Sequence, residues 1–512
     1  MVWLLNDVYD AEHRAYFMSE KKMELTPLKI RSHGASSVMH YDERYTPYIE
    51  MTGLLPFVQL VSRSTPNLNA AAVTALIDRW RPETHSFHLR TGEMTVTLQD
   101  VSMITALPIE GKPLCMSTDS EGWRHQMEAL IGMSPQEPEV EDGGKKDRVP
   151  AGATFTWIAA NFAHCPEDAD DEVIQRYARV YMWYVISRTI FADGTGKNAP
   201  WMWLKALIVL DNKFSWGSAA LAYLYRQLDN ACRRTTKDGG VCGCMLLLSV
   251  EWEPYGVGTN FGDAHTFELN PLCVQERHLW LMRCPLICNW AVEWHLPHRV
   301  LRQFGYFQPH PPEWVDTDTQ LHRLDRRRQR KIKDWQKHHK SYVLMFEQSV
   351  QATSSIQQTQ YRQHCALAFS NYLRWFQEST RVEICPPAYE EDILEEPTEY
   401  DELAQGGYSK LIREGYQTSF APVLNFVAAD DMTLKAFQRS AYVLKPRKEF
   451  KRYSPDDYAK GKNPVAGSSR LSRMRSREDE VEDDDDDESD DPDQFVVARR
   501  KKLVSKRGRG PK

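Results

Sequence analysis

The sequence predicts a mainly α, multi-helical globular domain with a small β-hairpin near residues 84–97 and a disordered, charged C-terminal tail. Three observations support this prediction. Apolar residues recur with helical spacing in most segments between residue 48 and residue 380. Two short β-prone runs flank a glycine-containing turn at residues 90–93. From about residue 446 onward, hydrophobicity is low and charge is high, so little apolar surface is available to offset chain entropy.

Composition sets the class of protein. With 512 residues, of which 42% are hydrophobic, the chain can bury a large core. The net charge of -7 averages a strongly acidic block against several basic ones. The ten cysteines form no disulfide framework, and we find neither a signal peptide nor an apolar run long enough to span a bilayer. We therefore expect a soluble, reduced, intracellular protein without a membrane partner.

The chain divides into four expected parts. Residues 1–24 are polar and aperiodic and are expected to be a loose lead-in, and residues 25–380 form the helical domain. Residues 381–445 are expected to be an acidic linker with one short helix. Residues 446–512 are the predicted disordered tail, with an acidic and then a basic block.

The domain begins with helices that glycine and proline interrupt. The pattern over residues 48–61 is broken at Gly53 and Pro56. A second helix is expected over residues 67–80, with Asn67 or Asn69 as its cap.

The hairpin near residues 84–97 leads directly into a capped helix. Thr97 and Asp100 have the spacing of a capping box, in which each side chain bonds the other residue's backbone N–H. The helix should end before Pro108, because the residue preceding a proline avoids the α region. Its expected apolar stripe, spaced every third residue, consists of Leu98, Val101, Ile104 and Leu107.

Helices are predicted for most of the remaining domain. Residues 134–150 are rich in charge, proline and glycine and are expected to form a surface loop. A long central helix with an acidic start is expected within residues 168–194. Residues 242–256 fit a buried strand or a buried helix, and we favour a helix because the neighbouring segments are helical. Further helices are expected within residues 201–212, 215–234, 274–305, 321–348 and 358–380.

Four blocks of this sequence, in this order, resemble the plant mobile domain, which occurs in Maintenance-of-Meristems-like proteins. The blocks are FHLRTGEMTVTLQDVSMITALPIEGKPL, SWGSAALAYLYRQLDNACRR, CPLICNWAVEWHLPHRVLRQFG and LHRLDRRRQRKIKDWQKHH. The resemblance covers roughly residues 25–380. In the first block, the residues that match the motif and are expected to define the fold are Phe87, His88, Gly92, Glu93, Thr97, Leu98, Asp100, Leu107 and Pro108.

The resemblance implies a mostly helical domain with nuclear roles in genome stability, transposon silencing and meristem development. It implies no established catalytic residue and no cofactor. Some relatives carry a fused phosphatase domain or parts of a transposable element, and the residues after 400 resemble neither. The expected partners are nuclear proteins, with histones, a phosphatase-like protein and DNA as candidates.

Two residue groups invite a chemical interpretation. His85 and His88 with Glu93 could act as a general-base cluster, but strand positions three apart point to opposite faces, so the imidazoles should not converge. Cys242, Cys244, Cys284 and Cys288, with Cys273 and His278, could bind zinc, although their spacing is not that of paired zinc ligands. Buried thiols without a metal fit that spacing better. The sequence also lacks the GxxxxGK[ST], GxSxG and HExxH motifs, so we expect no enzyme and no metal site.

Two basic segments are candidate contacts with other macromolecules. Six residues within 325–340 could neutralise DNA phosphates, and Trp335 could add a stacking face: Arg326, Arg327, Arg328, Arg330, Lys331 and Lys333. The alternatives are a solvated helix face or a contact with the protein's own acidic surface. The basic tail block suits a nuclear-import receptor through Arg499, Arg500, Lys501, Lys502, Lys506, Arg507 and Arg509. The acidic block, residues 478–491, suits histones, or it pairs with the basic block and confers only solubility.

The sequence therefore favours a non-enzymatic nuclear protein that serves as a protein or chromatin interaction platform. The alternative is a DNA-binding transposition factor, either still encoded by a transposable element or domesticated by the host.

Overall fold

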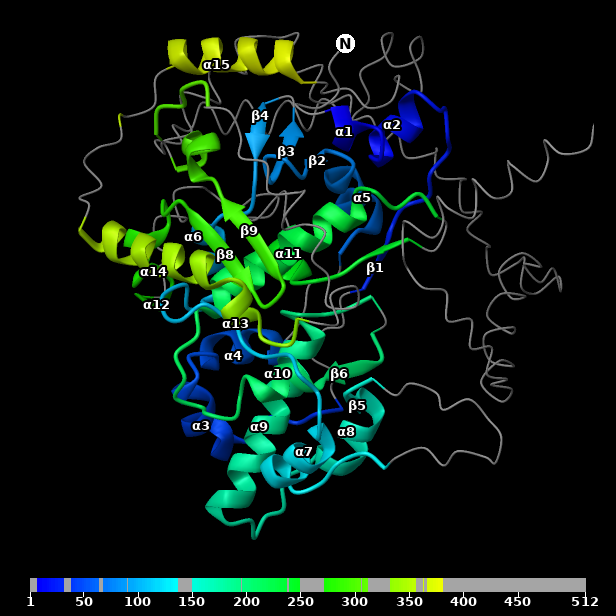
Figure 1. Ribbon diagram of the computed structural model, residues 1–512, viewed down its shortest axis with the longest axis vertical. Coiled ribbons are helices and arrows are strands. Elements are labelled where there is room, and N and C mark those ends of the chain that lie inside the picture. The colour runs from blue at the N-terminus through cyan, green and yellow to red at the C-terminus, as the bar shows by residue number, and fades with distance from the viewer. Residues whose placement is uncertain are drawn as a thin grey trace, which may run out of the picture. The chain divides into compact units, whose positions relative to one another are not determined.

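A computed structural model describes most of residues 7–380. The described residues are 7–31, 38–63, 68–89, 91–136, 150–194, 196–236, 239–248, 271–304, 306–311, 332–355, 362 and 366–380. They form a mainly α structure with a few short strands, as predicted (Figure 1). None of the helices in this part of the chain has the length and apolarity that crossing a bilayer requires.

The chain divides into two units, Met1–Ala441 and Tyr442–Lys512, and every described residue belongs to the first. The acidic linker and the charged tail expected from residue 381 onward lie outside the described residues.

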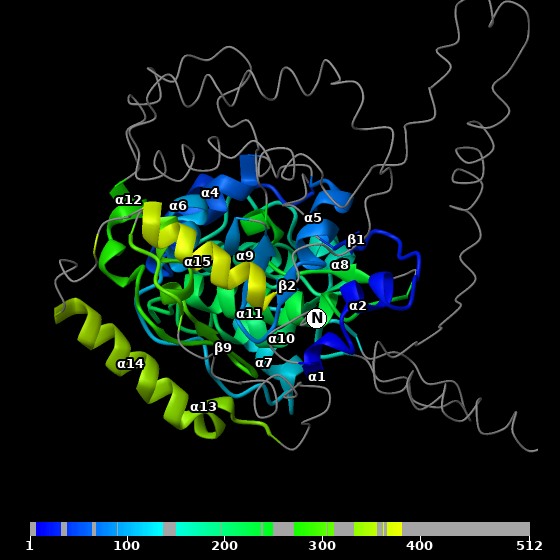
Figure 2. The same cartoon turned by 90° about the horizontal axis from the view of Figure 1, so that it is seen from above.

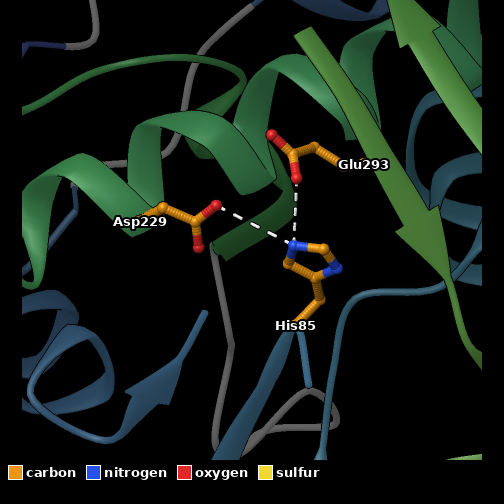
Figure 3. A group of neighbouring side chains, drawn as sticks. All are labelled: His85, Asp229 and Glu293. Atoms are coloured by element: carbon orange, nitrogen blue, oxygen red, sulfur yellow. Dashed lines mark ion pairs between the residues drawn. The ribbon is translucent and has the colours of Figure 1, made fainter. Parts of the chain in front are cut away.

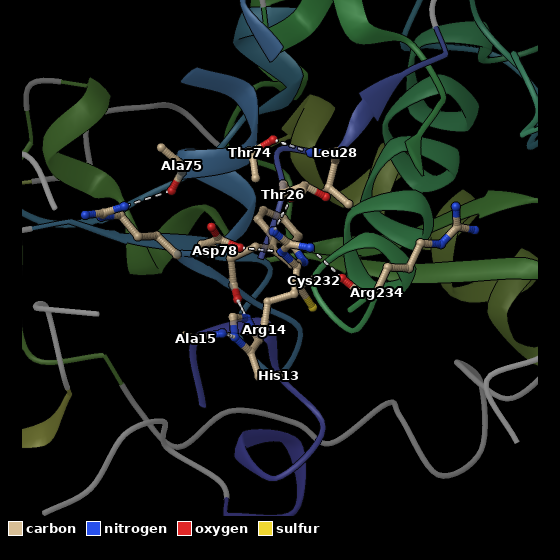
Figure 4. Close-up of polar contacts among 12 residues, drawn as sticks. His13, Arg14, Ala15, Thr26, Leu28, Thr74, Ala75, Asp78, Cys232 and Arg234 are labelled. Atoms are coloured by element: carbon tan, nitrogen blue, oxygen red, sulfur yellow. Dashed lines mark hydrogen bonds and ion pairs between the residues drawn. The ribbon is translucent and has the colours of Figure 1, made fainter. Parts of the chain in front are cut away.

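The N-terminal segment is packed over its described part. It contains helices α1 (Asp7–Asp10) and α2 (Arg14–Ser19). Arg14 is 1% exposed, and its Nε bonds Asp78 at 2.7 Å while its two terminal nitrogens donate to the carbonyls of Arg234 and Thr26 (Figure 4). The expectation of a loose lead-in is therefore wrong here, because a buried ion pair ties α2 to the domain.

The break expected at Gly53 is confirmed, whereas Pro56 lies in the first turn of a helix and does not interrupt it. A short 3-10 turn (Glu43–Tyr45) precedes α3 (Thr46–Met51) and α4 (Leu55–Arg63), and Gly53 separates them with a positive φ of 76°. Helix α5 (Ala70–Ile77) begins at Asn69, whose side chain accepts from the amides of Ala71 and Ala72.

The predicted hairpin is confirmed as part of a three-stranded antiparallel sheet in the order β2-β3-β4. Its strands are β2 (Trp80–Arg81), β3 (Ser86–Leu89) and β4 (Gly92–Met94). The register places His88 opposite Glu93 and Leu89 opposite Gly92. Trp80, expected at the end of the helix over residues 67–80, lies instead in β2.

Helix α6 (Leu98–Thr105) has the predicted capping box between Thr97 and Asp100. Its buried face includes Leu98 and Val101, whereas Ile104 is 39% exposed, so the expected stripe is wrong at that position. The buried face uses Thr105 in place of Ile104. Thr105 follows Val101 by four residues, and this step keeps a side chain closer to one helix face than repeated steps of three residues do. The helix ends at Ala106, which adopts the left-handed conformation two residues before Pro108.

Two long helices form the centre of the domain. Helix α9 (Asp171–Arg188) is the predicted central helix, and it contacts α3, α7, α8 and α10. Helix α11 (Trp216–Ala231) contacts α6 on one side and a second hairpin on the other. The smaller elements around them are α7 (Trp123–Ile131), β5 (Gly152–Thr154), α8 (Phe155–Phe162), β6 (Asn198–Pro200) and α10 (Trp201–Lys205).

The helical expectation for residues 274–305 is wrong in its middle. Strands β8 (Cys284–Cys288) and β9 (Ala291–His295) form an antiparallel hairpin, which turns at Asn289 with a φ of 50° (Figure 1). Every residue of β8 is buried, so its sequence is a continuous apolar run and does not alternate between apolar and polar residues. The helix favoured for residues 242–256 is likewise reduced to a 3-10 turn, Met245–Leu248, in its described part. The short elements here are β1 (Lys29–Ile30), β7 (Gly240–Val241), α12 (Pro271–Val274) and the 3-10 turns Arg277–Leu279, Pro297–Arg299 and Leu301–Phe304.

The last described helices cover the two hairpins. Helices α13 (Trp335–His338) and α14 (Lys340–Ser355) follow each other (Figure 2). Helix α14 packs against β8. Helix α15 (Ala366–Ser379) contacts β4 and buries its own apolar cluster of Phe369, Tyr372, Leu373 and Phe376.

Candidate functional site

Charged side chains are buried where the β2-β3-β4 sheet, α11 and the β8-β9 hairpin meet. We call this region the histidine–carboxylate layer, and it contains two clusters. The His85 cluster consists of His85, Asp229, Glu293, Arg226 and Trp80. The His88 cluster consists of His88, Glu93, Arg299 and Thr380.

His85 lies between two carboxylates. Its Nε2 is 3.0 Å from Glu293 Oε2 and 3.8 Å from Asp229 Oδ2 (Figure 3). Its other nitrogen, Nδ1, is 3.1 Å from the carbonyl oxygen of Trp294. Because the side chain is 3% exposed, these contacts replace water almost completely.

Three elements bring these groups together. Arg226 and Asp229 are three residues apart on α11 and so share one face of that helix. Glu293 is the middle residue of β9, which packs on α11. His85 precedes β3 and has a φ of 49°, a left-handed conformation that is uncommon outside glycine.

In each of the two carboxylates, the other oxygen accepts a hydrogen bond from a neighbouring side chain. Trp80 Nε1 donates to Asp229 Oδ1 at 2.6 Å, and Arg226 Nε donates to Glu293 Oε1 at 2.5 Å. Burial lowers the pKa of His85, but the hydrogen bond to Glu293 and the charge of Asp229 together outweigh it and raise the pKa. The imidazolium form of His85 is therefore favoured beside these acids.

The His88 cluster is arranged differently. Arg299 binds both oxygens of Glu93, at 2.6 Å and 3.1 Å, as a fork. His88 Nε2 is 3.3 Å from Glu93 Oε1, and its Nδ1 is 2.7 Å from the hydroxyl oxygen of Thr380. Burial lowers the pKa of His88 to about 4, so the ring is neutral at pH 7.

Glu93 remains ionised despite its complete burial. Burial alone would raise its pKa, but the charge of Arg299 and the contact with His88 lower the pKa to about 2. A neutral His88 then donates its Nε2–H to Glu93 and accepts from the Thr380 hydroxyl.

Helix α15 closes the layer over β4. The Tyr372 hydroxyl accepts from the amide of Glu93 at 2.9 Å. Gly92 has a φ of 103°, and a Cβ there would lie 2.7 Å from the Tyr372 ring. Only glycine therefore permits this contact between the turn and α15.

The motif residues expected to define the fold lie in or beside this layer. Phe87 packs edge-to-face on Trp80, with ring centroids 4.8 Å apart. The carbonyl oxygen of Pro108 accepts from the amide of Gly217 at the start of α11. Leu98 and Leu107 are at most 1% exposed, and Asp100 is held by Thr97.

The two histidines belong to separate clusters, each with its own acid. The prediction that the two imidazoles do not converge is confirmed, but the sequence did not reveal the partners supplied by distant segments. These partners are Arg226, Asp229, Glu293 and Arg299. A charged residue inside an otherwise apolar run, such as Glu293 in AVEWH, was the available signal.

The cysteines show the environment of buried thiols. Cys242, Cys244, Cys284 and Cys288 are buried thiols that form no disulfide, and burial raises the pKa of Cys244 to about 12. Within the described residues, the group of histidine, cysteine and acidic side chains close enough to hold a metal ion is His85, Asp229 and Glu293.

Only part of the basic segment can be located. Lys333 is described, and its Nζ lies 3.0 Å from Asp119 and 3.6 Å from Glu121. Trp335 is fully buried and donates to Thr118, so the expected stacking face is wrong. The other five basic candidates and the import signal lie outside the described residues.

A cavity of about 350 Å³ lies apart from the histidine–carboxylate layer. It is lined by Lys112, Pro113, Cys115, Met116, Asn212, Phe214, Gln336, Val343 and Glu347. No member of either histidine cluster lines it.

Comparison with known proteins identifies the class. The plant mobile domain profile matches residues 56–255 and 248–377, so the chain belongs to the plant mobile domain family. This confirms the resemblance seen in the sequence. No solved structure matches the chain.

Three proteins from Arabidopsis thaliana are similar to parts of this chain. Serine/threonine-protein phosphatase 7 long form homolog is 30% identical over 62% of this chain and 27% of its own length. Protein MAIN-LIKE 1 is 30% identical over 51% of this chain and 58% of its own length. Protein MAINTENANCE OF MERISTEMS is 29% identical over 48% of this chain and 59% of its own length. The matched regions thus span less than two thirds of each relative.

Proposed function

We propose that this protein is a non-enzymatic nuclear protein whose plant mobile domain is a platform for protein and chromatin interactions. The observation that carries the proposal is the burial of His85 and of the motif histidine His88. Both are almost completely buried, and both bind acids of the domain's own interior.

This arrangement does not suit general acid–base catalysis. A general base must reach a proton on the substrate, directly or through one water molecule. Both ring nitrogens of His88 are engaged inside the protein, and its pKa of about 4 makes it a weak base. The layer therefore supports a role in holding the domain together.

Support for the biological setting comes from the relatives' names and from the tail. A relative named for the maintenance of meristems supports a role in meristem development. Roles in genome stability or transposon silencing rest on the family resemblance alone. The basic block at residues 498–512 suits nuclear import, and the acidic block at residues 478–491 suits histones. A phosphatase-like protein is a further partner, since the domain also occurs in a relative named as a phosphatase homolog.

Affinity purification of the tagged protein from plant nuclei tests this proposal. Half of each extract is treated with nuclease, and a variant with glutamine at the seven basic tail positions, fused to an unrelated import signal, serves as control. We expect a defined set of nuclear proteins to remain after nuclease treatment and with the control variant. Partners that disappear with nuclease would overturn the proposal and favour the DNA-binding transposition factor.

A further inference from the structure

We propose that His85, Asp229 and Glu293 form a binding site for one divalent first-row transition metal ion, such as Zn²⁺ or Mn²⁺. This inference is independent of the proposed interaction role.

The first argument is the distance between the ligand atoms. His85 Nε2, Asp229 Oδ2 and Glu293 Oε2 all lie within 4.8 Å of one another. Nε2 is 3.0 Å from the Glu293 oxygen and 3.8 Å from the Asp229 oxygen (Figure 3). Metal–nitrogen and metal–oxygen bonds of about 2.0–2.2 Å place neighbouring ligand atoms about 3 Å apart or slightly more. The three atoms can thus reach one ion with small adjustments.

The second argument is the orientation of each ligand by another group. His85 Nδ1 faces the Trp294 carbonyl oxygen, which directs Nε2 toward the two carboxylates. Trp80 holds the other oxygen of Asp229, and Arg226 holds the other oxygen of Glu293. Metal-binding histidines and carboxylates are oriented in this manner in known sites.

The His88 cluster provides an internal comparison. Arg299 binds both oxygens of Glu93, the carboxylate beside His88, as a fork. That cluster is a closed ion pair. In the His85 cluster, one ligand atom from each of three residues faces the same point instead.

Charge and ligand type indicate which metal suits the site. With His85 protonated, the charges of Arg226 and His85 balance those of the two carboxylates. A divalent ion would displace the His85 proton, and the one net negative charge that remains would attract the ion. One nitrogen and two oxygens without sulfur suit a divalent first-row ion better than a soft ion such as Cu⁺. Because the ligands come from the start of β3, from α11 and from β9, the ion would join these elements and stabilise the fold.

The test uses the full chain, stripped of metal with a chelator and then titrated with Co²⁺ as a spectroscopic probe. We expect one equivalent to bind with the visible spectrum of nitrogen and oxygen ligands, and the midpoint of thermal unfolding to rise by several degrees. Asp229→Asn retains an acceptor for Trp80 but weakens the ligand, so both effects should be lost. His88→Gln is the matched control and should retain both.

Two results would overturn the site. One is a wild-type protein whose unfolding midpoint does not respond to Co²⁺. The other is unchanged Co²⁺ binding by Asp229→Asn. X-ray absorption of the Co²⁺-loaded wild type requires no variant and decides the matter if Asp229→Asn fails to fold. One imidazole with oxygen ligands supports the site, whereas sulfur ligands would assign the ion to cysteines.

Discussion

His85 and His88 are three residues apart, yet their surroundings favour opposite protonation states. Two carboxylates face His85 and raise its pKa above the ordinary value despite burial. For His88, burial dominates, because Arg299 already neutralises Glu93 and leaves little charge to attract a proton. The neighbours of each ring, supplied by distant segments, therefore set its chemistry.

The neutral state of His88 predicts a pH dependence of stability. In the unfolded chain its pKa is near the ordinary value of about 6.5, whereas in the folded protein it is about 4. Between these values the unfolded state binds more protons, so the free energy of unfolding falls as the pH falls. We expect His88→Gln to remove this component, so the stability difference between wild type and variant should narrow from about pH 6.5 to about pH 4.5.

Urea unfolding of both proteins across this range measures the difference. The contribution of His85 has the opposite sign and is common to both proteins, so it cancels. Glu93, with a pKa of about 2, loses its contribution only below its ordinary pKa of about 4.5. A difference that stays constant or widens on acidification would show that His88 is not neutral in the folded state.

At the scale of elements, α6 shows that apolar residues of one helix can differ strongly in their exposed fraction. Leu98 is fully buried, and its amide donates toward His295 Nε2 at 3.4 Å. Ile104 is on the same helix but is 39% exposed. The hydrophobic contribution of the two residues to stability should therefore differ strongly.

We expect Leu98→Ala to lower the free energy of unfolding by about 2–5 kcal/mol, because it leaves a cavity in the core. Ile104→Ala is the matched control and should cost less than about 1 kcal/mol, since alanine also has the higher helix propensity. Chemical denaturation of the two variants tests this directly. Equal losses would mean that α6 packs on a different face.

Elements with a local signal could be predicted, and elements with a distant cause could not. The capping box of α6, the acidic start of α9 and the glycine turn before Glu93 depend on residues within one turn of each other. The β8-β9 hairpin could not be distinguished from a helix, because its strands are buried on both faces and show no alternation.

The candidate site was less predictable than the fold. His85 and Glu293 are separated by more than two hundred positions, and no periodicity connects them. The sequence marks Glu293 as a charge inside an apolar run, and buried charges are paired or bind metals, whereas Asp229 lies among polar residues and carries no such signal. The sequence alone could not have decided which partner each charge has.

At the scale of the whole molecule, charge is distributed unevenly between the interior, the basic segment and the tail. Several interior charges of the described residues are paired, as in Arg14 with Asp78 and Arg299 with Glu93. The net charge of -7 conceals clusters of both signs along the chain. Contact with nucleic acid would therefore depend on local segments rather than on the total charge.

The basic segment predicts salt-dependent DNA binding that is independent of base sequence. The background protein is the full chain with glutamine at the seven basic tail positions, so that the tail does not bind DNA. Five further glutamine substitutions, at Arg326, Arg327, Arg328, Arg330 and Lys331, should weaken binding equally on unrelated duplexes. The slope of log K against log salt should flatten by roughly 0.9 for each phosphate that these side chains neutralise in the background protein.

Lys333→Gln alone is the control for this measurement. Its ammonium group already lies beside Asp119 and Glu121, so we expect a smaller change in slope than one fully neutralised phosphate would give. Identical slopes for the background protein and the five-fold variant would show that the segment is a solvated surface.

The histidine–carboxylate layer joins segments that are far apart in the sequence. Its ion pairs connect β4 to the 3-10 turn Pro297–Arg299, and a hydrogen bond connects β3 to the residue after α15. Buried charges are costly to desolvate, so each depends on its partner. We infer that the layer contributes to the choice of a single packing arrangement among these distant segments.

The most direct test of this structural role is urea unfolding of Glu93→Gln, which removes the charge but keeps the size of a side chain that is fully buried. We expect a loss of about 3–5 kcal/mol, because Arg299 is left as a buried charge without its counterion. Glu128→Gln, on the exposed face of α7, is the control and should stay within about 0.5 kcal/mol of wild type. A Glu93→Gln protein that unfolds like wild type yet no longer retains its nuclear partners would contradict the structural role and make Glu93 a functional contact.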